Sequence, residues 1–112
     1  MTIEQKILGM IGIAKRGKYV QYGVNLPFTI RKRKVDVVFL ASDAASNSTT
    51  EILEAIKKVQ EVHPVTVYRN LTKAQLGEAI GHEPIAALGI LNSGIAHKMR
   101  DLEEEITNGE KQ

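Results

Sequence analysis

The chain of 112 residues contains no cysteine and no tryptophan, and only 4% of its residues are aromatic. The absence of cysteine excludes a disulfide scaffold, a thiolate metal site and a cysteine nucleophile. The longest apolar runs fall well short of the ~20 residues that a membrane-spanning helix requires. The amino-terminal segment carries an acid at Glu4 and has no small-residue cleavage site, so we expect no signal peptide. We therefore expect a cytoplasmic protein that does not attach to a membrane.

The composition is that of an ordinary globular domain. Hydrophobic residues make up 43% of the chain and charged residues 25%, which excludes a disordered chain. A length of 112 residues corresponds to one domain, long enough to bury its own core and too short for a multidomain enzyme. We assign this domain to residues 1–106 and expect a flexible acidic tail over residues 107–112.

The basic residues are concentrated in the first third of the chain. Residues 1–34 contain eight basic residues and one acidic residue, a net charge of +7. Residues 35–112 contain seven basic and twelve acidic residues, a net charge of −5. This asymmetry indicates a polyanionic partner for the basic part. The alternative is a solvated basic face that binds nothing.

The spacing of apolar residues alternates between helical and strand patterns. A first helix ends at Gly17 and carries one apolar stripe, made of Ile3, Ile7, Met10, Ile11 and Ala14. Residues 18–21 form a short strand candidate and residues 23–25 a turn. Pro27 then suits the first turn of a short helix that runs to about Lys34. The apolar, β-branched run over residues 35–41 predicts a central strand covered on both faces.

The remainder of the chain repeats this alternation. Two capping boxes, Ser48–Glu51 and Thr72–Gln75, each predict a helix start, and these helices end at Pro64 and Gly81. Strands are predicted over residues 65–68 and 85–90, and Asn92 or Ser93 caps a last helix. The inward-facing residues are Ile52, Ala55, Ile56, Val59 and Val62, then Leu76, Ala79 and Ile80, and finally Ile95, Met99, Leu102 and Ile106. The pattern predicts an α/β protein, a three-layer α/β/α sandwich with a four-stranded, largely parallel or mixed sheet.

We find no motif for catalysis or metal binding. The three histidines do not fall at metal-ligand spacing, and no nucleophile-elbow or phosphate-loop motif is present. Asp43 follows the central strand, where α/β enzymes keep an acid. A small enzyme would have to gather Asp43, Ser46 and a histidine in one pocket. The simpler interpretation makes Asp43, Ser46 and Asn47 a loop that prepares the next helix. We predict no catalytic residue, no metal and no cofactor.

The segment from Gly23 to Lys34 points to nucleic acid. It opens a helix with Gly23, Val24 and Asn25, where backbone N–H groups are available to phosphates or bases, and it closes with four consecutive cations. Asn25 can either cap the helix or hydrogen-bond a base edge. Local aromatics are few, so a structured RNA read by its shape fits better than a single strand stacked on aromatic rings.

Four stretches of the chain carry a resemblance to a known family. They are residues 12–18 with Val20, residues 37–48, residues 76–81 and residues 92–96. Their order and spacing resemble the kink-turn RNA-binding ribosomal proteins, the L7Ae/L30e superfamily, and most of all its small bacterial YlxQ-type branch. The resemblance covers nearly the whole chain. It implies a three-layer α/β/α fold without enzymatic activity.

The resemblance also implies a binding surface and a partner. RNA would be held by Gly23, Val24 and Asn25 at the start of the second helix, with Arg31 and Lys32 further along it. The loop before the last strand would help, through Gly81, His82 and Glu83. The alternative interpretation of this loop is a plain turn that binds nothing. The partner would be a structured RNA, ribosomal or another kink-turn-like RNA, bound by a monomer that associates with the ribosome.

The same helix departs from the family pattern. Members that bind kink-turns place a small polar residue, then Glu or Gln, then Lys in its first turns, whereas this chain has Leu26, Pro27 and Phe28. The alternative function is therefore a protein-protein interaction module with a decayed RNA surface. In that case Leu26, Pro27 and Phe28 would form an apolar contact patch.

Overall fold

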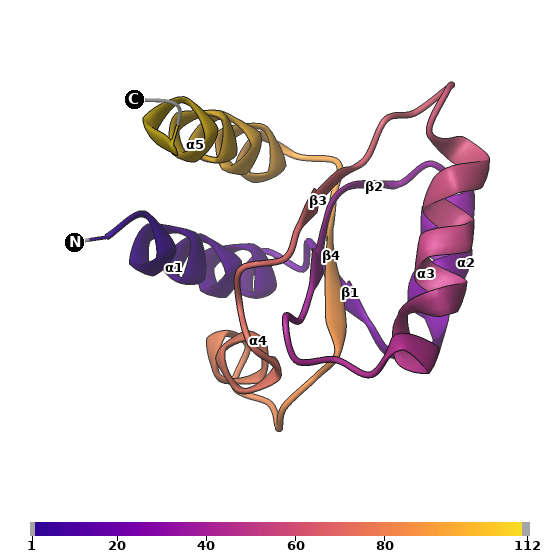
Figure 1. Cartoon of the computed structure of the whole chain (residues 1–112), viewed down its shortest axis with the longest axis horizontal. Coiled ribbons are helices and arrows are strands. Elements are labelled where there is room, and N and C mark those ends of the chain that lie inside the picture. The colour runs from indigo at the N-terminus through magenta and orange to yellow at the C-terminus, as the bar shows by residue number, and fades with distance from the viewer. Residues whose placement is uncertain (1, 111–112) are drawn as a thin grey trace.

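The computed structural model describes the backbone of residues 2–110 and the side chains of residues 2–102. Five α-helices, four strands and one 3₁₀ turn follow one another along the chain (Figure 1). In order they are α1 (Ile3–Arg16), β1 (Val20–Tyr22), the 3₁₀ turn η1 (Gly23–Asn25), α2 (Leu26–Arg31), β2 (Val35–Leu40), α3 (Ser46–Val59), β3 (Thr66–Tyr68), α4 (Lys73–Ala79), β4 (Ala87–Leu91) and α5 (Gly94–Glu110).

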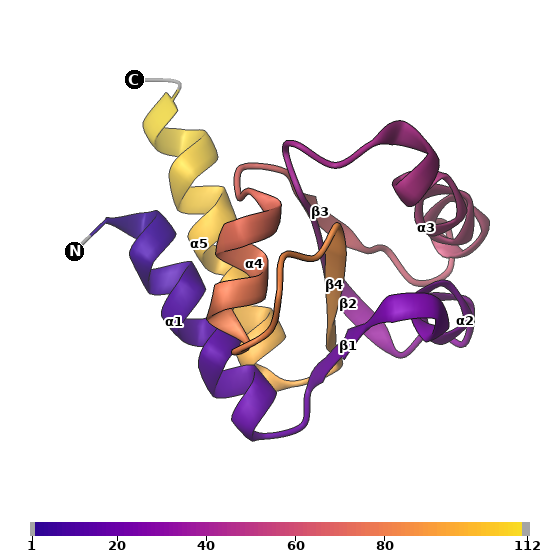
Figure 2. The ribbon, with the colours of Figure 1, turned by 90° about the horizontal axis from the view of Figure 1, so that it is seen from below.

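The strands form one sheet between two layers of helices. Their order is β1-β4-β2-β3, with β2 and β3 parallel and the other two neighbouring pairs antiparallel. Helices α1, α4 and α5 cover one face, and α2 and α3 cover the other (Figures 1 and 2). The predicted three-layer fold is confirmed, and the sheet is mixed. No helix in the described part of the chain is long and apolar enough to cross a bilayer.

Strand β2 supplies both cores because its side chains alternate between the two faces. Val37 and Phe39 point towards α1, α4 and α5, whereas Val38 and Leu40 point towards α2 and α3. The register shifts between Val35 and Val37, so Asp36 lies in a β-bulge opposite β4. The bulge turns Val35 to the α2–α3 side, out of simple alternation with Val37. It explains how an acid interrupts an apolar central strand.

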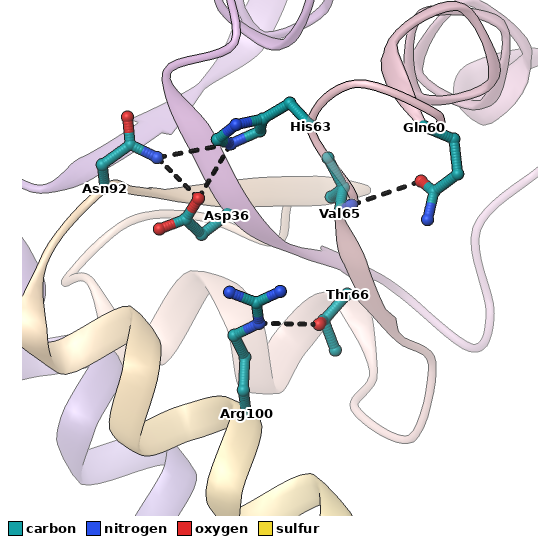
Figure 3. Close-up of polar contacts among 7 residues, drawn as sticks. All are labelled: Asp36, Gln60, His63, Val65, Thr66, Asn92 and Arg100. Atoms are coloured by element: carbon teal, nitrogen blue, oxygen red, sulfur yellow. Dashed lines mark hydrogen bonds and ion pairs between the residues drawn. The ribbon is translucent and has the colours of Figure 1, made fainter.

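A small polar cluster holds the sheet at this end. Asp36 Oδ1 lies 2.9 Å from His63 Nε2 and accepts a hydrogen bond of 2.6 Å from Asn92 Nδ2 (Figure 3). We call these three residues the polar clasp. Nearby, Arg100 Nε on α5 donates to Thr66 Oγ1 on β3 at 3.3 Å. The clasp thus ties the connection before β3 and the end of β4 to the bulge in β2.

Most of the predicted helix boundaries are confirmed. Helix α1 ends at Gly17 and Pro27 lies in the first turn of α2. The capping box of Thr72 and Gln75 is present, with Gln75 N donating to Thr72 Oγ1 at 3.2 Å. Of the two candidate caps of α5, Ser93 is the one observed: its Oγ accepts a hydrogen bond of 3.2 Å from Ala96 N.

Other predictions at helix ends are wrong. The capping box at Ser48–Glu51 does not form, because α3 begins three residues earlier than this pattern predicts, and its N-cap residue Ala45 makes no side-chain hydrogen bond. Helix α2 ends at Arg31 instead of near Lys34. Val62 lies beyond α3 and is 62% exposed, so it does not belong to the core.

The carboxyl-terminal predictions are only partly within the described residues. Helix α5 buries Met99 and partly buries Ile95 and Leu102, as expected. The side chain of Ile106 lies outside the described residues. The helical backbone continues to Glu110, and residues 111 and 112 also lie outside the description. A flexible tail over residues 107–112 therefore stays a prediction.

Helix α2 approaches the sheet closely at one point. Leu26 is fully buried, and a Cβ added to Gly89 of β4 would lie 2.7 Å from Leu26 Cδ1 and 3.0 Å from Val35 Cγ1. A glycine inside a strand commonly marks such a close approach. The missing side chain of Gly89 makes the space into which Leu26 packs, and this contact sets the height of α2 above the sheet.

We therefore expect Gly89→Val to lower the free energy of unfolding by about 1–3 kcal/mol, because the added methyl groups overpack a filled core. Denaturant unfolding monitored by circular dichroism measures this change. Gly9→Ala is the matched control, since Gly9 is exposed on α1 with open space at its Cβ and should gain up to about 1 kcal/mol. Equal stability of Gly89→Val and the parent chain would contradict the packing argument.

Candidate nucleic-acid interface

The connection from β1 into α2 presents three residues at the surface. Gly23 has φ +84°, a left-handed conformation that favours glycine, and η1 follows directly. Gly23, Val24 and Asn25 are all exposed, and the Val24 side chain is 93% exposed. The next two residues, Leu26 and Pro27, are buried. Anchoring by these two residues holds the preceding turn outward.

This burial corrects the alternative function. The apolar contact patch expected from Leu26, Pro27 and Phe28 does not exist, because only Phe28 reaches the surface, where it is 56% exposed. Asn25 occupies the N-cap position of α2, but its side chain makes no capping hydrogen bond. Of the two interpretations of Asn25, the structure therefore does not support the cap. Its carbonyl oxygen accepts from Thr29 Oγ1 at 2.9 Å.

The loop before β4 is held tightly against α4. Gly81 is left-handed at φ +66°, and His82 N donates to Gly77 O at 2.8 Å. A Cβ on Gly77 would lie 2.8 Å from His82 O and would also collide with the backbone of Glu83. Ile85 N donates to Lys73 O at 3.2 Å. The loop is therefore a fixed part of the fold, and its residues Gly81, His82 and Glu83 are exposed.

An open groove of about 590 Å³ forms where this loop meets the start of α2. The rings of Tyr22 and His82 make an edge contact across it, with centroids 5.0 Å apart. The start of α3 completes the groove. Its lining residues are Tyr22, Gly23, Val24, Leu26 and Pro27 from the first segment, Asn47, Ser48, Glu51 and Ile52 from α3, and His82, Ile85, Ala86 and Ala87 from the third segment.

The groove gathers part of the predicted site. It brings together Gly23, Val24 and His82, and Asn25, Gly81 and Glu83 are exposed beside it in the same two segments. Sequence reasoning missed the third wall, formed by Asn47, Ser48 and Glu51. The Ser48–Glu51 pattern draws attention to these residues, but it predicts a helix cap and not a binding surface. No pattern within the chain signals that α3 begins opposite the loop before β4.

The predicted cations lie towards the other end of α2. Arg31, Lys32, Arg33 and Lys34 are all exposed, and among the side chains of residues 2–102 none of them forms an ion pair with a carboxylate. Lys32 Nζ lies 4.6 Å from the centroid of the Phe28 ring, a cation–π contact. The cluster is thus available to an anion that also reaches the start of α2.

Arg33 adopts an unusual backbone conformation. Its φ is +62°, and its N–H donates to Ile30 O at 2.9 Å in the turn that closes α2. This left-handed position favours glycine, and a long side chain there costs of order 1 kcal/mol. Such strain at an exposed cation motivates a functional role for the side chain.

The residues considered for catalysis are placed differently. Asp43 Oδ1 accepts a hydrogen bond of 2.8 Å from Lys73 N, so this acid secures the start of α4 rather than preparing α3. Ser46 and His82 line different cavities. Within the described residues no three potential ligands are grouped to hold a metal ion. The structure therefore does not bring Asp43, Ser46 and His82 together in one pocket.

Comparisons with known proteins identify the family of the chain. A family model described as the ribosomal protein L7Ae/L30e/S12e/Gadd45 family matches residues 5–100. The RNA-binding protein YlxQ of Enterococcus faecium is 30% identical over 101 residues, which cover 89% of this chain and 93% of that protein.

Two solved structures share the fold. A protein of unknown function from Bacillus halodurans superposes with a TM-score of 0.76 at 24% identity, over 87% of this chain and 95% of that one. A 15.5 kD RNA-binding protein of Giardia lamblia superposes with a TM-score of 0.67 at 18% identity, over 89% of each chain. Because the family model covers most of its length, the chain belongs to the ribosomal protein L7Ae/L30e/S12e/Gadd45 family, in agreement with the expected absence of enzymatic activity.

Proposed function

We propose that the protein is a non-catalytic, ribosome-associated RNA-binding module that recognises structured, kink-turn-like RNA. The observation that carries this proposal is the uncompensated cationic cluster Arg31–Lys34, joined by the six-residue helix α2 to the exposed segment Gly23–Asn25. Cations that lack internal partners lose little by binding phosphates and release counterions from the RNA.

The relatives support the same class of ligand. The Enterococcus protein and the Giardia protein are both named as RNA-binding proteins. The Enterococcus protein aligns with nearly the whole of this chain, so the exposed segment and the cationic cluster fall within the aligned length. RNA binding by this chain is the simplest function that unites the family, the charge distribution and the surface geometry.

The protein-interaction alternative has less support. It requires an apolar surface, yet Leu26 and Pro27 are buried and Lys32 lies over the remaining aromatic ring, that of Phe28. The surface at the end of α2 is dominated by the cations Arg31–Lys34, which suit a polyanion better than an apolar protein face.

The double substitution Arg31→Ala and Lys32→Ala should weaken binding to a structured RNA. Each cation that contacts a phosphate contributes about one unit to the slope of log affinity against log salt, so the slope should flatten by about two. Filter binding across a salt series measures both quantities. Lys6→Ala with Lys98→Ala is the matched control, because these exposed lysines lie on α1 and α5, across the sheet from α2. An unchanged slope in the Arg31/Lys32 variant would remove this surface from the interface.

Replacing Arg33 by glycine should move stability and binding in opposite directions. Glycine relieves the left-handed strain, which should raise the free energy of unfolding by up to about 1 kcal/mol. The loss of the cation should lower RNA affinity and reduce the salt slope by about one. Thermal unfolding and filter binding test the two effects. A variant that binds RNA as well as the parent at every salt concentration would show that Arg33 has no part in binding.

Kink-turn recognition is tested by comparing a kink-turn RNA with the same stem lacking its bulge. A protein that reads the kinked shape should prefer the bulged RNA by about tenfold or more, whereas a general polyanion binder should bind both equally. A gel-shift titration at physiological salt distinguishes the two cases. Equal affinities would leave RNA binding in place and overturn the kink-turn part of the proposal.

A further inference from the structure

Helices α1, α2 and α4 end in the same kind of turn, a Schellman motif, in which two N–H groups beyond the helix donate back to carbonyls of its last turn. In the turn after α4, Gly81 N donates to Glu78 O at 3.1 Å and His82 N donates to Gly77 O at 2.8 Å. The motif requires a left-handed backbone at the first residue beyond the C-cap, and this position favours glycine. Helix α4 meets the requirement with Gly81, at φ +66°.

Helix α1 places a lysine at the corresponding position. Lys18 has φ +65°, and its N–H donates to Lys15 O at 3.0 Å. Tyr19 N donates to Ala14 O at 2.8 Å, which completes the motif. A long side chain therefore occupies a backbone conformation that glycine would adopt without strain.

The turn after α2 repeats this arrangement. Arg33 has φ +62°, its N–H donates to Ile30 O at 2.9 Å, and Lys34 N donates to Thr29 O at 3.4 Å. Within the described part of the chain, Lys18 and Arg33 are the only residues other than glycine with a positive φ. Both are cations, so the strain and the positive charge occur together at two separate helix ends.

The helix dipoles do not account for these two side chains. Cations near a helix C-terminus are favourable, but the last turns already contain Lys15 and Arg16 in α1 and Arg31 in α2. A glycine is also present beside the strained position of α1, since Gly17 has φ −84°. A Cβ on Gly17 would lie 2.9 Å from the Tyr19 ring, so this glycine serves that contact instead. Local folding therefore leaves the cations at the left-handed positions unexplained.

The sheet brings the two turns to the same end of the molecule. Leu91 N donates to Tyr19 O at 2.7 Å, and Asn92 N donates to Lys34 O at 3.0 Å. Strands β1 and β2 thus begin on either side of the end of β4, about 10 Å apart, which is twice the spacing of neighbouring strands. The groove lies at the opposite end of β4, where Ala87 lines it. We call the cations of the two turns the cationic rim, which consists of Lys15, Arg16, Lys18, Arg33 and Lys34.

The charge of the cationic rim is not compensated within the described side chains. All five of its residues are exposed, and none forms an ion pair with a carboxylate of residues 2–102. The acid at the start of β2, Asp36, is only 17% exposed, and its Oδ1 already contacts His63 and Asn92 in the polar clasp. The rim is therefore free to bind an external polyanion.

We propose that the cationic rim binds the backbone of a double-helical arm of the RNA, beyond the part that contacts the start of α2. This inference rests on the RNA-binding function proposed above. The two sides of the rim would each meet the phosphates of one strand, since duplex RNA is contacted through its shape and its phosphates. A single strand would instead need several rings on which its bases could stack, and the rim has one, Tyr19. Contacts of this kind add affinity without sequence preference.

The inference predicts that affinity depends on the length of the RNA arms. The probes are two bulged hairpins with the same bulge and loop, whose arms have about 5 or about 14 base pairs, the longer arm exceeding the 34 Å extent of the molecule. In filter binding at one salt concentration, the parent should bind the long-armed RNA about tenfold more tightly, because each added phosphate contact releases counterions. An unstructured single strand as long as that RNA should compete about tenfold more weakly than the RNA itself.

Lys18→Gly removes the cation and the strain together. It should raise Tm by about 2–5 °C, lower affinity for the long-armed RNA by about fivefold, and reduce the salt slope for that RNA by about one. Affinity for the short-armed RNA should stay unchanged, and Lys18→Arg should bind both RNAs as the parent does. The control is Lys6→Gln, because Lys6 is exposed on α1 about 13 Å before Lys15 along the helix axis. This variant should bind both RNAs as the parent does.

The outcomes separate this inference from the function on which it rests. The inference is wrong if arm length does not affect the affinity of the parent, if Lys18→Gly loses no affinity or loses it equally for both RNAs, or if the single strand competes as well as the duplex. A Tm at or below that of the parent would contradict the strain argument. RNA binding itself then still stands, provided that the Arg31/Lys32 double variant loses affinity for the short-armed RNA. If the parent binds none of these RNAs, both proposals are wrong.

Discussion

The contact between Leu26 and Gly89 is the constraint on which the binding surface depends. A glycine in β4 leaves room for a fully buried leucine, and this anchors the first turn of α2 against the sheet. Because Leu26 and Pro27 point inward, the residues before them must turn outward, and Gly23 supplies the left-handed backbone for that turn. The exposed segment and one wall of the groove follow from how this short helix is seated. A surface fixed by core packing needs little rearrangement before it binds.

The two ends of α2 have different chemistry. Its start borders a groove without lysine or arginine, where Glu51 offers hydrogen-bond acceptors. Its end leads into four exposed cations. In nucleic-acid recognition, contacts to phosphates supply affinity and position, whereas contacts to bases supply specificity. Helix α2 has six residues, so its two ends lie within the span of a few nucleotides.

Local signals predicted most of the fold and only part of the site. The capping box at Thr72 and the glycine that ends α1 act within a few residues, so the sequence reveals them. The start of α3 differs from the prediction because the Ser48–Glu51 pattern resembles a cap but lies inside the helix. Asp43, which we expected to prepare α3, instead accepts a hydrogen bond from the backbone of α4. Tyr22 and His82 meet only through the antiparallel pairing of β1 with β4. Such long-range neighbours leave no periodic trace in the chain.

The three walls of the groove come from segments centred some 25 to 60 residues apart, around Val24, Ser48 and Ile85. No single helix or strand carries the groove alone, and the unfolded chain has no equivalent of it. A ligand seated there binds the native state alone, so mass action raises the apparent stability of the fold with the logarithm of ligand concentration. The polar clasp lies at the other end of the sheet, far from such a ligand. If the domain unfolds as one cooperative unit, the ligand stabilises the clasp against unfolding by the same free energy.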